Sequence, residues 1–250
     1  MPKERYYTQE TLQEGSSILL QGDEFHHLSH VMRQREGEKV ELINGSGILA
    51  SASICTLRHH SATLQITSVS SQSPPPLSLV LVQALSPSNR LEDVLEKGTE
   101  LGADAFWFFG AEKGKQAILS PSRQRRFEKI VLAATKQSGR LYLPALCFLP
   151  NLSFLLRNVP QTATLLFGHI YSSEPNLLSL STASLFQPET THLFFCTGPE
   201  SGWSSQELQI LAAHKAKAVQ LNAHTLRMET AAITAAAFLN FLIGKELKVL

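Results

Sequence analysis

The 250-residue chain has few cysteines and no long apolar run. Its cysteines, Cys55, Cys147 and Cys196, stand far apart and form no CxxC pair, which argues against a disulfide framework or a zinc site and favours a reducing compartment. The first seven residues lack the apolar segment of a signal peptide. The apolar stretch at 231–244 is too short and too interrupted by polar residues to span a bilayer. The sequence therefore predicts a cytoplasmic protein without a membrane segment.

A strong net charge and a phosphate-binding fingerprint are also missing. The formal net charge of +1 neither requires nor excludes a polyanionic partner. The absence of a Walker loop and of G-x-G-x-x-G disfavours a generic nucleotide-binding α/β enzyme. Charge is nevertheless uneven, because the segment 113–140 carries 8 Lys and Arg residues against one acid, Glu128. An RNA backbone would be met there, although a solvated helix face explains the same charges.

Proline marks a boundary in the chain. The Ser- and Pro-rich stretch 68–76 ends in three consecutive prolines, which favour a stiff extended linker. We therefore expect a first domain over residues 1–72 and a second over 73–250. In the first, short strands of period two are expected, with a turn at 44–47; their ranges are 39–43, 49–54 and 62–69. This pattern favours a small β-barrel or sandwich.

The pattern changes after the linker to alternating strands and helices. Apolar strands are expected at 77–85, 105–109, 164–167, 193–196 and 218–221. The expected helices run from about 91 to a C-terminal Gly102, from the Ser120-Pro121 start to about 137, from a Ser204–Glu207 capping box onward, and from about 231. Such alternation predicts an α/β domain with a mainly parallel sheet covered on both faces.

The most informative stretch is Thr197-Gly198-Pro199-Glu200-Ser201-Gly202-Trp203-Ser204, which follows the apolar strand 193–196. A buried strand that ends in a Gly/Pro loop and then begins a helix is where open α/β folds bind ligands. The pattern recurs, because the strand 218–221 ends at Asn222 and residues 226–231 lead into the last helix. We therefore expect two neighbouring strand ends to form a ligand site.

Four motifs occur together and in order: Glu96-Lys97-x-x-Glu100-Leu101-Gly102, Gln137-x-x-Arg140, Thr197-Gly198-Pro199-Glu200-x-Gly202 and Leu226-Arg227-x-Glu229-Thr230-Ala231. In this combination the chain resembles the RsmE family, ribosomal RNA uridine-N3 methyltransferases of the SPOUT class. The resemblance covers nearly the whole chain. It includes matching positions in the first domain, at His27, Val31, Arg33, Gly37 and Gly45.

The resemblance implies a fold and an activity. It implies a PUA-like β-barrel that helps to hold RNA, and an α/β domain whose last strands are tied into a deep trefoil knot, which no periodicity could reveal. The implied reaction is methylation of N3 of one uridine in the decoding region of small-subunit ribosomal RNA, in the assembled particle, with S-adenosyl-L-methionine as cofactor and no metal. The family also implies a homodimer in which both subunits shape the active site.

The resemblance further implies the site residues. The cofactor pocket would be formed by three loops and would include Phe167, Gly168, His169, Thr197, Gly198, Pro199, Glu200, Gly202, Leu221, Asn222, Leu226 and Thr230. Glu200 and Glu229 are candidates for stabilising the sulfonium and for taking the N3 proton, and which does which stays open. Arg227 and Arg140 are candidates for holding a phosphate or the uracil oxygens. RNA contacts are expected from Arg5, His27, Arg33, Arg123, Arg126 and Arg140.

Plainer explanations exist for several of these residues. Glu200 and Glu229 could each be an acid that stabilises a helix N-terminus. The group His26, His27 and His30 has the composition of a metal cluster but no carboxylates arranged with it, so RNA contact or packing is favoured for His27. The apolar C-terminal helix is expected in the core or in a subunit interface.

The chain departs from the family pattern at a few positions. Ser201 and Asn222 replace glycines, and His30 and His224 replace frequent arginines. A positive φ at Ser201 would cost about 1 kcal/mol. Two alternatives follow: a SPOUT methyltransferase acting on another RNA atom or on transfer RNA, and a catalytically silent RNA-binding assembly factor whose pocket Ser201 and Asn222 have spoiled.

Overall fold

The computed structural model describes residues 4–113, 119–170, 176–177 and 185–247. The chain forms two compact units, residues 1–74 with 132–143 and residues 75–131 with 144–250. The domain boundary predicted after residue 72 is two residues from the position, between residues 74 and 75, where the chain passes from the first unit to the second. The segment 132–143 contains the end of helix α3 (Pro121–Ser138) and the loop after it. Nothing in the sequence pattern indicated that this segment belongs to the first unit.

The first unit is built on a five-stranded sheet with the order β1-β3-β4-β5-β2. The strands are β1 (Arg5–Tyr7), β2 (Ser17–Gln21), β3 (Lys39–Ile43), β4 (Ile48–Leu57) and β5 (Ser61–Ser71). Neighbouring strands are antiparallel except β1 and β3, which are parallel. Alternating apolar residues of these strands form one core with Tyr6, and helix α1 (Gly22–His26) and π-helix η1 (His27–Val31) contribute Phe25 and Leu28 to it.

The three strands predicted for this unit are confirmed, whereas the predicted start of the linker is wrong. Strand β3 has the predicted bounds, and the predicted turn before β4 contains Gly45 and Gly47 at φ 71° and 89°, where glycine has no steric penalty. The linker was expected to begin at residue 68, but β5 continues to Ser71, which pairs with Ile48 of β4. Pairing with β4 thus extends β5 through polar residues whose side chains do not indicate a strand. Strands β1 and β2 were missed.

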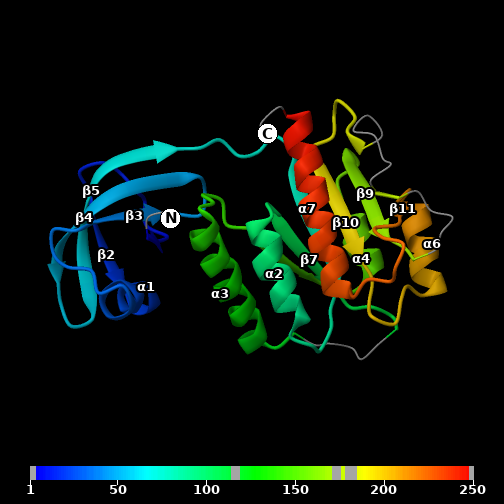
Figure 1. The fold of residues 1–250 in the computed structure, drawn as a ribbon, viewed down its shortest axis with the longest axis horizontal. Helices are drawn as coiled ribbons and strands as arrows, with labels where there is room; N and C mark the ends of the chain where they lie inside the picture. Colours follow the sequence, from blue (N-terminus) through cyan, green and yellow to red (C-terminus); the bar gives the residue numbers. More distant parts are fainter. Residues whose placement is uncertain (1–3, 114–118, 171–175, 178–184, 248–250) are drawn as a thin grey trace. The chain divides into compact units, whose positions relative to one another are not determined.

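The second unit is a six-stranded, fully parallel sheet with the order β11-β9-β10-β6-β7-β8 (Figure 1). The strands are β6 (Ser78–Ala84), β7 (Ala105–Phe109), β8 (Ala145–Leu149), β9 (Ala163–Gly168), β10 (His192–Thr197) and β11 (Lys217–Val219). The helices, besides α3, are α2 (Arg90–Glu100), α4 (Leu152–Arg157), α6 (Ser205–Ala213) and α7 (Met228–Glu246). The parallel α/β prediction is confirmed; β8 and α4 were missed.

The helices divide between the two faces of this sheet. On one face, Val82 and Cys196 pack in a cluster with Leu155 of α4 and Leu211 of α6. On the other, α7 contacts β6 and β10 and lies beside α2, as Figure 1 shows. Because side chains alternate along a strand, Gln83 and Thr197 point toward the α2 and α7 face. No helix among the described residues is long and apolar enough to cross a membrane.

The cysteines differ enough in environment to predict their reactivity. Cys55 is exposed, whereas Cys196 is buried in β10, and burial raises the pKa of its thiol. Because the thiolate is the reactive form, iodoacetamide at about pH 8 should modify native Cys55 readily and Cys196 only after unfolding. Peptide mass spectrometry of native and denatured samples would measure both rates. Equal labelling of Cys55 and Cys196 in the native protein would contradict the burial of Cys196.

Candidate functional site

The site lies at the carboxyl edge of the parallel sheet, around the point where the strand order reverses. Strands β7 and β8 follow β6 on one side of the sheet, whereas β10, β9 and β11 lie on the other side of β6. The loops after β6 and β10 therefore flank a topological switch point, the usual ligand position in open α/β sheets. The sequence singled out the ends of β10 and β11 as neighbours. These two strands are not adjacent, because β9 lies between them and pairs with each.

Arg90 connects the two acids that the sequence singled out. Its Nη1 donates to Glu200 Oε1 at 2.8 Å, and its Nε lies 3.7 Å from Glu229 Oε1. Arg90 is the first residue of α2, Glu200 stands in the loop after β10, and Glu229 lies in the first turn of α7. The structure thus brings Glu200 and Glu229 to one cation. Sequence reasoning missed Arg90; its signal was an arginine at the start of the helix that follows β6.

Some buried polar atoms at the ends of β6 and β10 and at the start of α7 have no hydrogen-bond partner among the described residues. They are Gln83 Oε1, Thr197 Oγ1 and Glu229 Oε2. Gln83 and Thr197 stand opposite each other at the ends of β6 and β10, and Gln83 Nε2 donates to the Thr197 carbonyl at 3.4 Å. Buried polar groups are normally paired, and an unpaired set at a strand edge is suited to a polar ligand.

Trp203 holds the ends of β9 and β10 together. Its indole Nε1 donates to the carbonyl of Gly168 at 2.9 Å, and its ring lies parallel to that of Phe109 with the centroids 6.1 Å apart. A Cβ at Gly198 would come within 2.8 Å of Cε2 of the indole, so a side chain there is excluded. Two predicted loops are therefore fixed against one aromatic ring. Trp203 lies in the stretch 197–204 that the sequence singled out, but no role was predicted for it.

The loop after β10 closes in a tight turn without strain at Ser201. Gly202 N donates to the Pro199 carbonyl at 2.8 Å, and the positive φ of the turn, 73°, falls on Gly202. Ser201 and Asn222 have no positive φ, so neither departure from glycine carries the cost that a left-handed conformation would bring. Ser201 Oγ donates to the Lys113 carbonyl instead, at 3.1 Å.

The third predicted loop joins the first through the backbone. His169 N donates to the Val219 carbonyl at 2.9 Å, which links the end of β9 to the end of β11. Residues 222–225 are exposed, and Asn222 Oδ1 accepts from His224 N at 3.1 Å. Leu221 and Leu226 are half-buried, and Thr230 is exposed. Arg227, an exposed residue, is the N-cap of α7.

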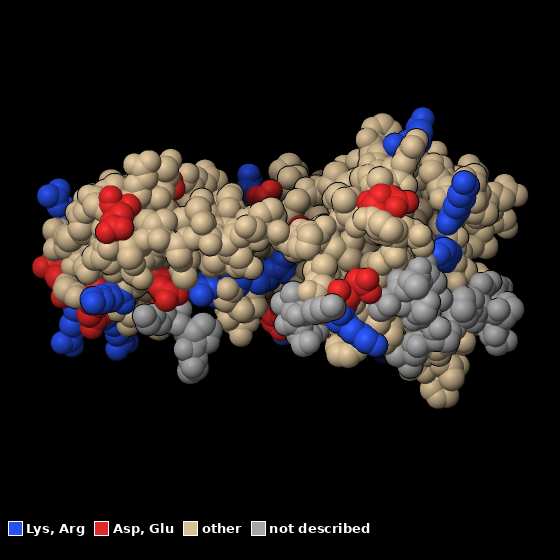
Figure 2. All heavy atoms as spheres, turned by 90° about the horizontal axis from the view of Figure 1, so that it is seen from above, with Lys and Arg blue, Asp and Glu red and all other residues tan. Residues whose placement is uncertain are grey.

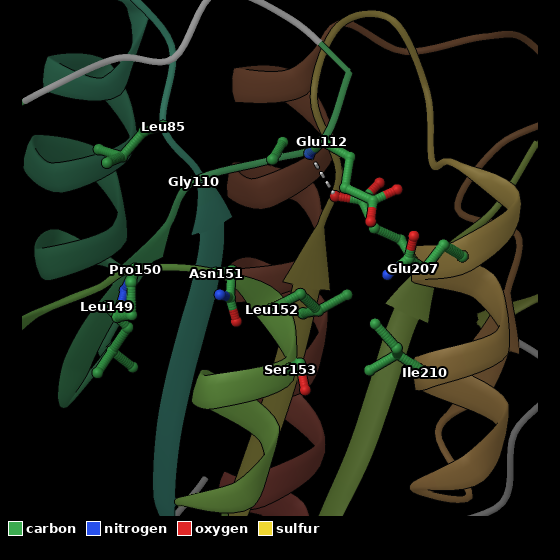
Figure 3. A pocket seen from close by; sticks show the side chains of 12 residues that line it. Leu85, Gly110, Glu112, Leu149, Pro150, Asn151, Leu152, Ser153, Glu207 and Ile210 are labelled. Atoms are coloured by element: carbon green, nitrogen blue, oxygen red, sulfur yellow. Dashed lines mark hydrogen bonds between the residues drawn. The ribbon is translucent and has the colours of Figure 1, made fainter.

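A cavity of about 550 Å³ lies at the same edge of the sheet, between the first turns of α4 and α6 (Figure 3). Glu207 is buried in its wall, where its carboxylate accepts from Glu112 N at 3.1 Å and from Ser204 N at 2.8 Å. Ser204 Oγ accepts from Glu207 N at 2.9 Å, so the predicted capping box is confirmed. The cavity lining contains none of the predicted cofactor residues. Its buried carboxylate fixes the start of α6 directly after the loop that holds Glu200.

The predicted RNA contacts are distributed over both units. In the second, Arg123 donates to the carbonyls of Ser86 and Ser88 at 2.7 and 2.8 Å, and Arg126 pairs with Glu92 at 2.6 Å. In the first, Arg5 donates to Glu41 at 3.0 Å and to the Gly139 carbonyl. Arg33 is exposed, His27 packs edge-on to Tyr6, and Arg140 lies in the segment 132–143. On the face in Figure 2, basic and acidic side chains are interspersed across a mainly uncharged surface.

The histidine group is arranged for ring contacts. The rings of His26 and His30 stack with their centroids 4.9 Å apart. Within the described ranges, no three His, Cys, Asp or Glu residues are grouped so that they could hold a metal ion.

Comparison with known proteins agrees with this geometry. Residues 73–240 match the model of the RNA methyltransferase domain family, and residues 20–67 match the RNA methyltransferase PUA domain. A ribosomal RNA small subunit methyltransferase E from Synechocystis sp. is 29% identical over 91% of this chain and 74% of its own length. The relative of that name from Mycobacterium tuberculosis is 30% identical, over 88% of this chain and 85% of its own length.

A solved structure is similar along nearly the whole chain. The ribosomal RNA small subunit methyltransferase E from Neisseria gonorrhoeae, bound to S-adenosyl methionine, is 30% identical, with a TM-score of 0.84 over 96% of this chain and 98% of its own. Both domains and their order along the chain are therefore shared. The chain belongs to the ribosomal RNA small subunit methyltransferase E family, the RsmE family.

Proposed function

We propose that this protein methylates N3 of one uridine in the decoding region of small-subunit ribosomal RNA, with S-adenosyl-L-methionine as methyl donor. Family membership supports a methyltransferase that acts on small-subunit RNA. The observation that carries the proposal is the meeting of Glu200 and Glu229 at Arg90, beside the switch point of the sheet. The uridine, its N3 atom and the decoding region come from the family resemblance, and the assembled particle is the proposed substrate.

The residues present fit the methyl donor. Gly198 makes room for Trp203, which encloses one side, Gly168 has no side chain to obstruct the end of β9, and the unpaired oxygens of Gln83 and Thr197 offer polar contacts. When bound, the donor supplies an electrophilic methyl group on a sulfonium sulfur. The remaining predicted cofactor residues, on the loops after β9, β10 and β11, would complete the pocket.

The acids and arginines are proposed to act on the acceptor proton, the sulfonium and the acceptor nucleotide. The uracil N3 must lose its proton so that its electron pair can form the new bond to the methyl carbon, and the carbon–sulfur bond breaks with its electrons left on sulfur. Glu229 is only 13% exposed and has one unpaired oxygen, which suits a group that accepts a proton or faces a cation. Arg227 and Arg140 are proposed to hold the acceptor phosphate or to stabilise charge on the uracil oxygens.

Product analysis tests the proposal directly. Small-subunit particles that lack the modification would be incubated with the enzyme and isotopically labelled S-adenosylmethionine, and the RNA would be digested for nucleoside mass spectrometry. We expect labelled 3-methyluridine from particles, with free RNA as a comparison substrate. A different labelled nucleoside, or label only in transfer RNA, would refute the proposed specificity and support another RNA methyltransferase activity.

The alternative function, a catalytically silent RNA-binding assembly factor, has less support. It supposed that Ser201 and Asn222 spoil the pocket, but neither residue has a left-handed backbone. Undetectable binding of S-adenosylmethionine in calorimetry, together with tight RNA binding, would restore it.

The proposed assembly is a homodimer that shares its active sites, and the proposed chain path includes the trefoil knot. The dimer is supported by α7, an apolar helix that leaves Phe241 56% exposed. Large exposed apolar side chains on such a helix are suited to a subunit interface. Sedimentation of the protein at micromolar concentration would test this assembly.

A further inference from the structure

Arg90 stands at a position where three elements converge. It begins α2 directly after the loop from β6, and its guanidinium reaches Glu200 after β10 and Glu229 on α7. The contact to Glu200 spans 110 positions of the sequence. One side chain thus links both sides of the switch point, where β6 and β10 pair and where Gln83 and Thr197 are buried.

Stability does not explain this arrangement. The Arg90 side chain is 37% exposed and that of Glu200 is 50% exposed. Ion pairs with this much solvent contact contribute little to folding, because water screens the charges and both side chains lose rotamer freedom. An arginine that meets two acids, one of which has a buried unpaired oxygen, is therefore better explained by what it does to those acids.

We infer that Arg90 is a positioning residue for methyl transfer, which holds the carboxylates of Glu200 and Glu229 in their working orientations. This inference rests on the proposed function. The planar guanidinium offers donors in a fixed fork, so it can restrain two carboxylates at once. It contacts Oε1 of Glu229, whereas Oε2 of the same carboxylate is buried and has no protein partner. A lysine would supply the charge without the fork.

Kinetics of Arg90 variants test the inference. At metal sites, removal of a group that orients a ligand costs about 10- to 100-fold. By analogy, we expect Arg90→Met to lower kcat by about that factor, while the KM for small-subunit particles changes by less than about threefold. Arg90→Lys should recover part of the loss. Because Arg90 acts through the acids, Arg90→Met combined with Glu200→Gln should lose less activity than the product of the two single losses.

The matched control is Lys97→Met, which removes from the same helix a cation that also contacts two acids, Glu96 and Glu100 at 2.8 and 3.0 Å. It should retain wild-type kcat. Thermal melting of every variant separates misfolding from lost positioning, and Arg90→Lys serves if Arg90→Met does not fold. A wild-type kcat in Arg90→Met, or losses that multiply in the double variant, would overturn the inference alone. An inactive wild-type enzyme would instead refute the proposed function.

Discussion

Replacing Glu229 by glutamine should abolish most of the methyl transfer while the fold survives. If its carboxylate takes the N3 proton or faces the sulfonium, kcat should fall by about 10²–10⁴-fold, because an amide can neither accept a proton at this pH nor carry a negative charge. The change is nearly isosteric, and the lost interaction with the α7 helix dipole is worth about 1–2 kcal/mol at this partly buried position. Steady-state transfer of labelled methyl groups to small-subunit particles measures the loss.

The matched control is Glu246→Gln, the same substitution at the other end of α7, where the side chain is exposed. Its kcat should equal that of the wild type. Calorimetric titration with S-adenosylmethionine then separates the two duties, since weaker binding in Glu229→Gln would assign it to the sulfonium and unchanged binding to the proton. A Glu229→Gln enzyme with more than half of the wild-type kcat would remove Glu229 from the proposed mechanism.

The substitution Gly198→Ala should have a comparable effect by a different route. Its new Cβ would meet Trp203 at 2.8 Å, and the indole is restrained by Gly168 and by Phe109. Overpacking of this kind costs about 1–3 kcal/mol, and a displacement of about 1 Å at a reacting site can cost about 10²-fold. We expect kcat for methyl transfer to fall about 10²-fold, and the affinity for S-adenosylmethionine, measured by calorimetry, to fall with it, together with a lower melting temperature.

Gly168→Ala is the control for packing. A Cβ there would lie 3.5 Å from Phe195, which is ordinary van der Waals contact, so the protein should fold and melt like the wild type. Equal melting temperatures for the Gly198→Ala and Gly168→Ala proteins, with undiminished affinity in Gly198→Ala, would show that Trp203 does not fix the loop after β10.

The parts of the fold that local chemistry determines could be predicted from the sequence. Strand β7 is a continuous apolar run, Ser120 and Ser204 supply N-caps, and Gly102 ends α2 at φ 94°. The missed elements are those whose partners determine them. Strand β1 has only three residues and pairs in parallel with β3, so its conformation depends on residues more than thirty positions away.

The candidate site divides in the same way. The loops that carry Glu200 and Glu229 were indicated by glycine, proline and helix signals along the chain, and the two acids became candidates through the family resemblance. Arg90 and Trp203 could not be identified, since their roles depend on contacts between distant segments. The sequence also could not show which residue of the turn after β10 has a positive φ. In the structure that residue is Gly202 and not Ser201.

The end of helix α3 limits where the chain can be cut to separate the first unit from the second. The last residues of this helix and the loop after it pair with the first unit: Lys136 meets Glu24 at 2.6 Å, Gly47 N donates to the Leu141 carbonyl, and Leu143 N donates to the Gly45 carbonyl. A gene fragment ending at the linker would lack residues 132–143, and it would leave Glu24, Gly47 N and the Gly45 carbonyl without these partners. The first unit is therefore not separable at the linker, and recombination that transfers it to another protein must include residues 132–143 as well.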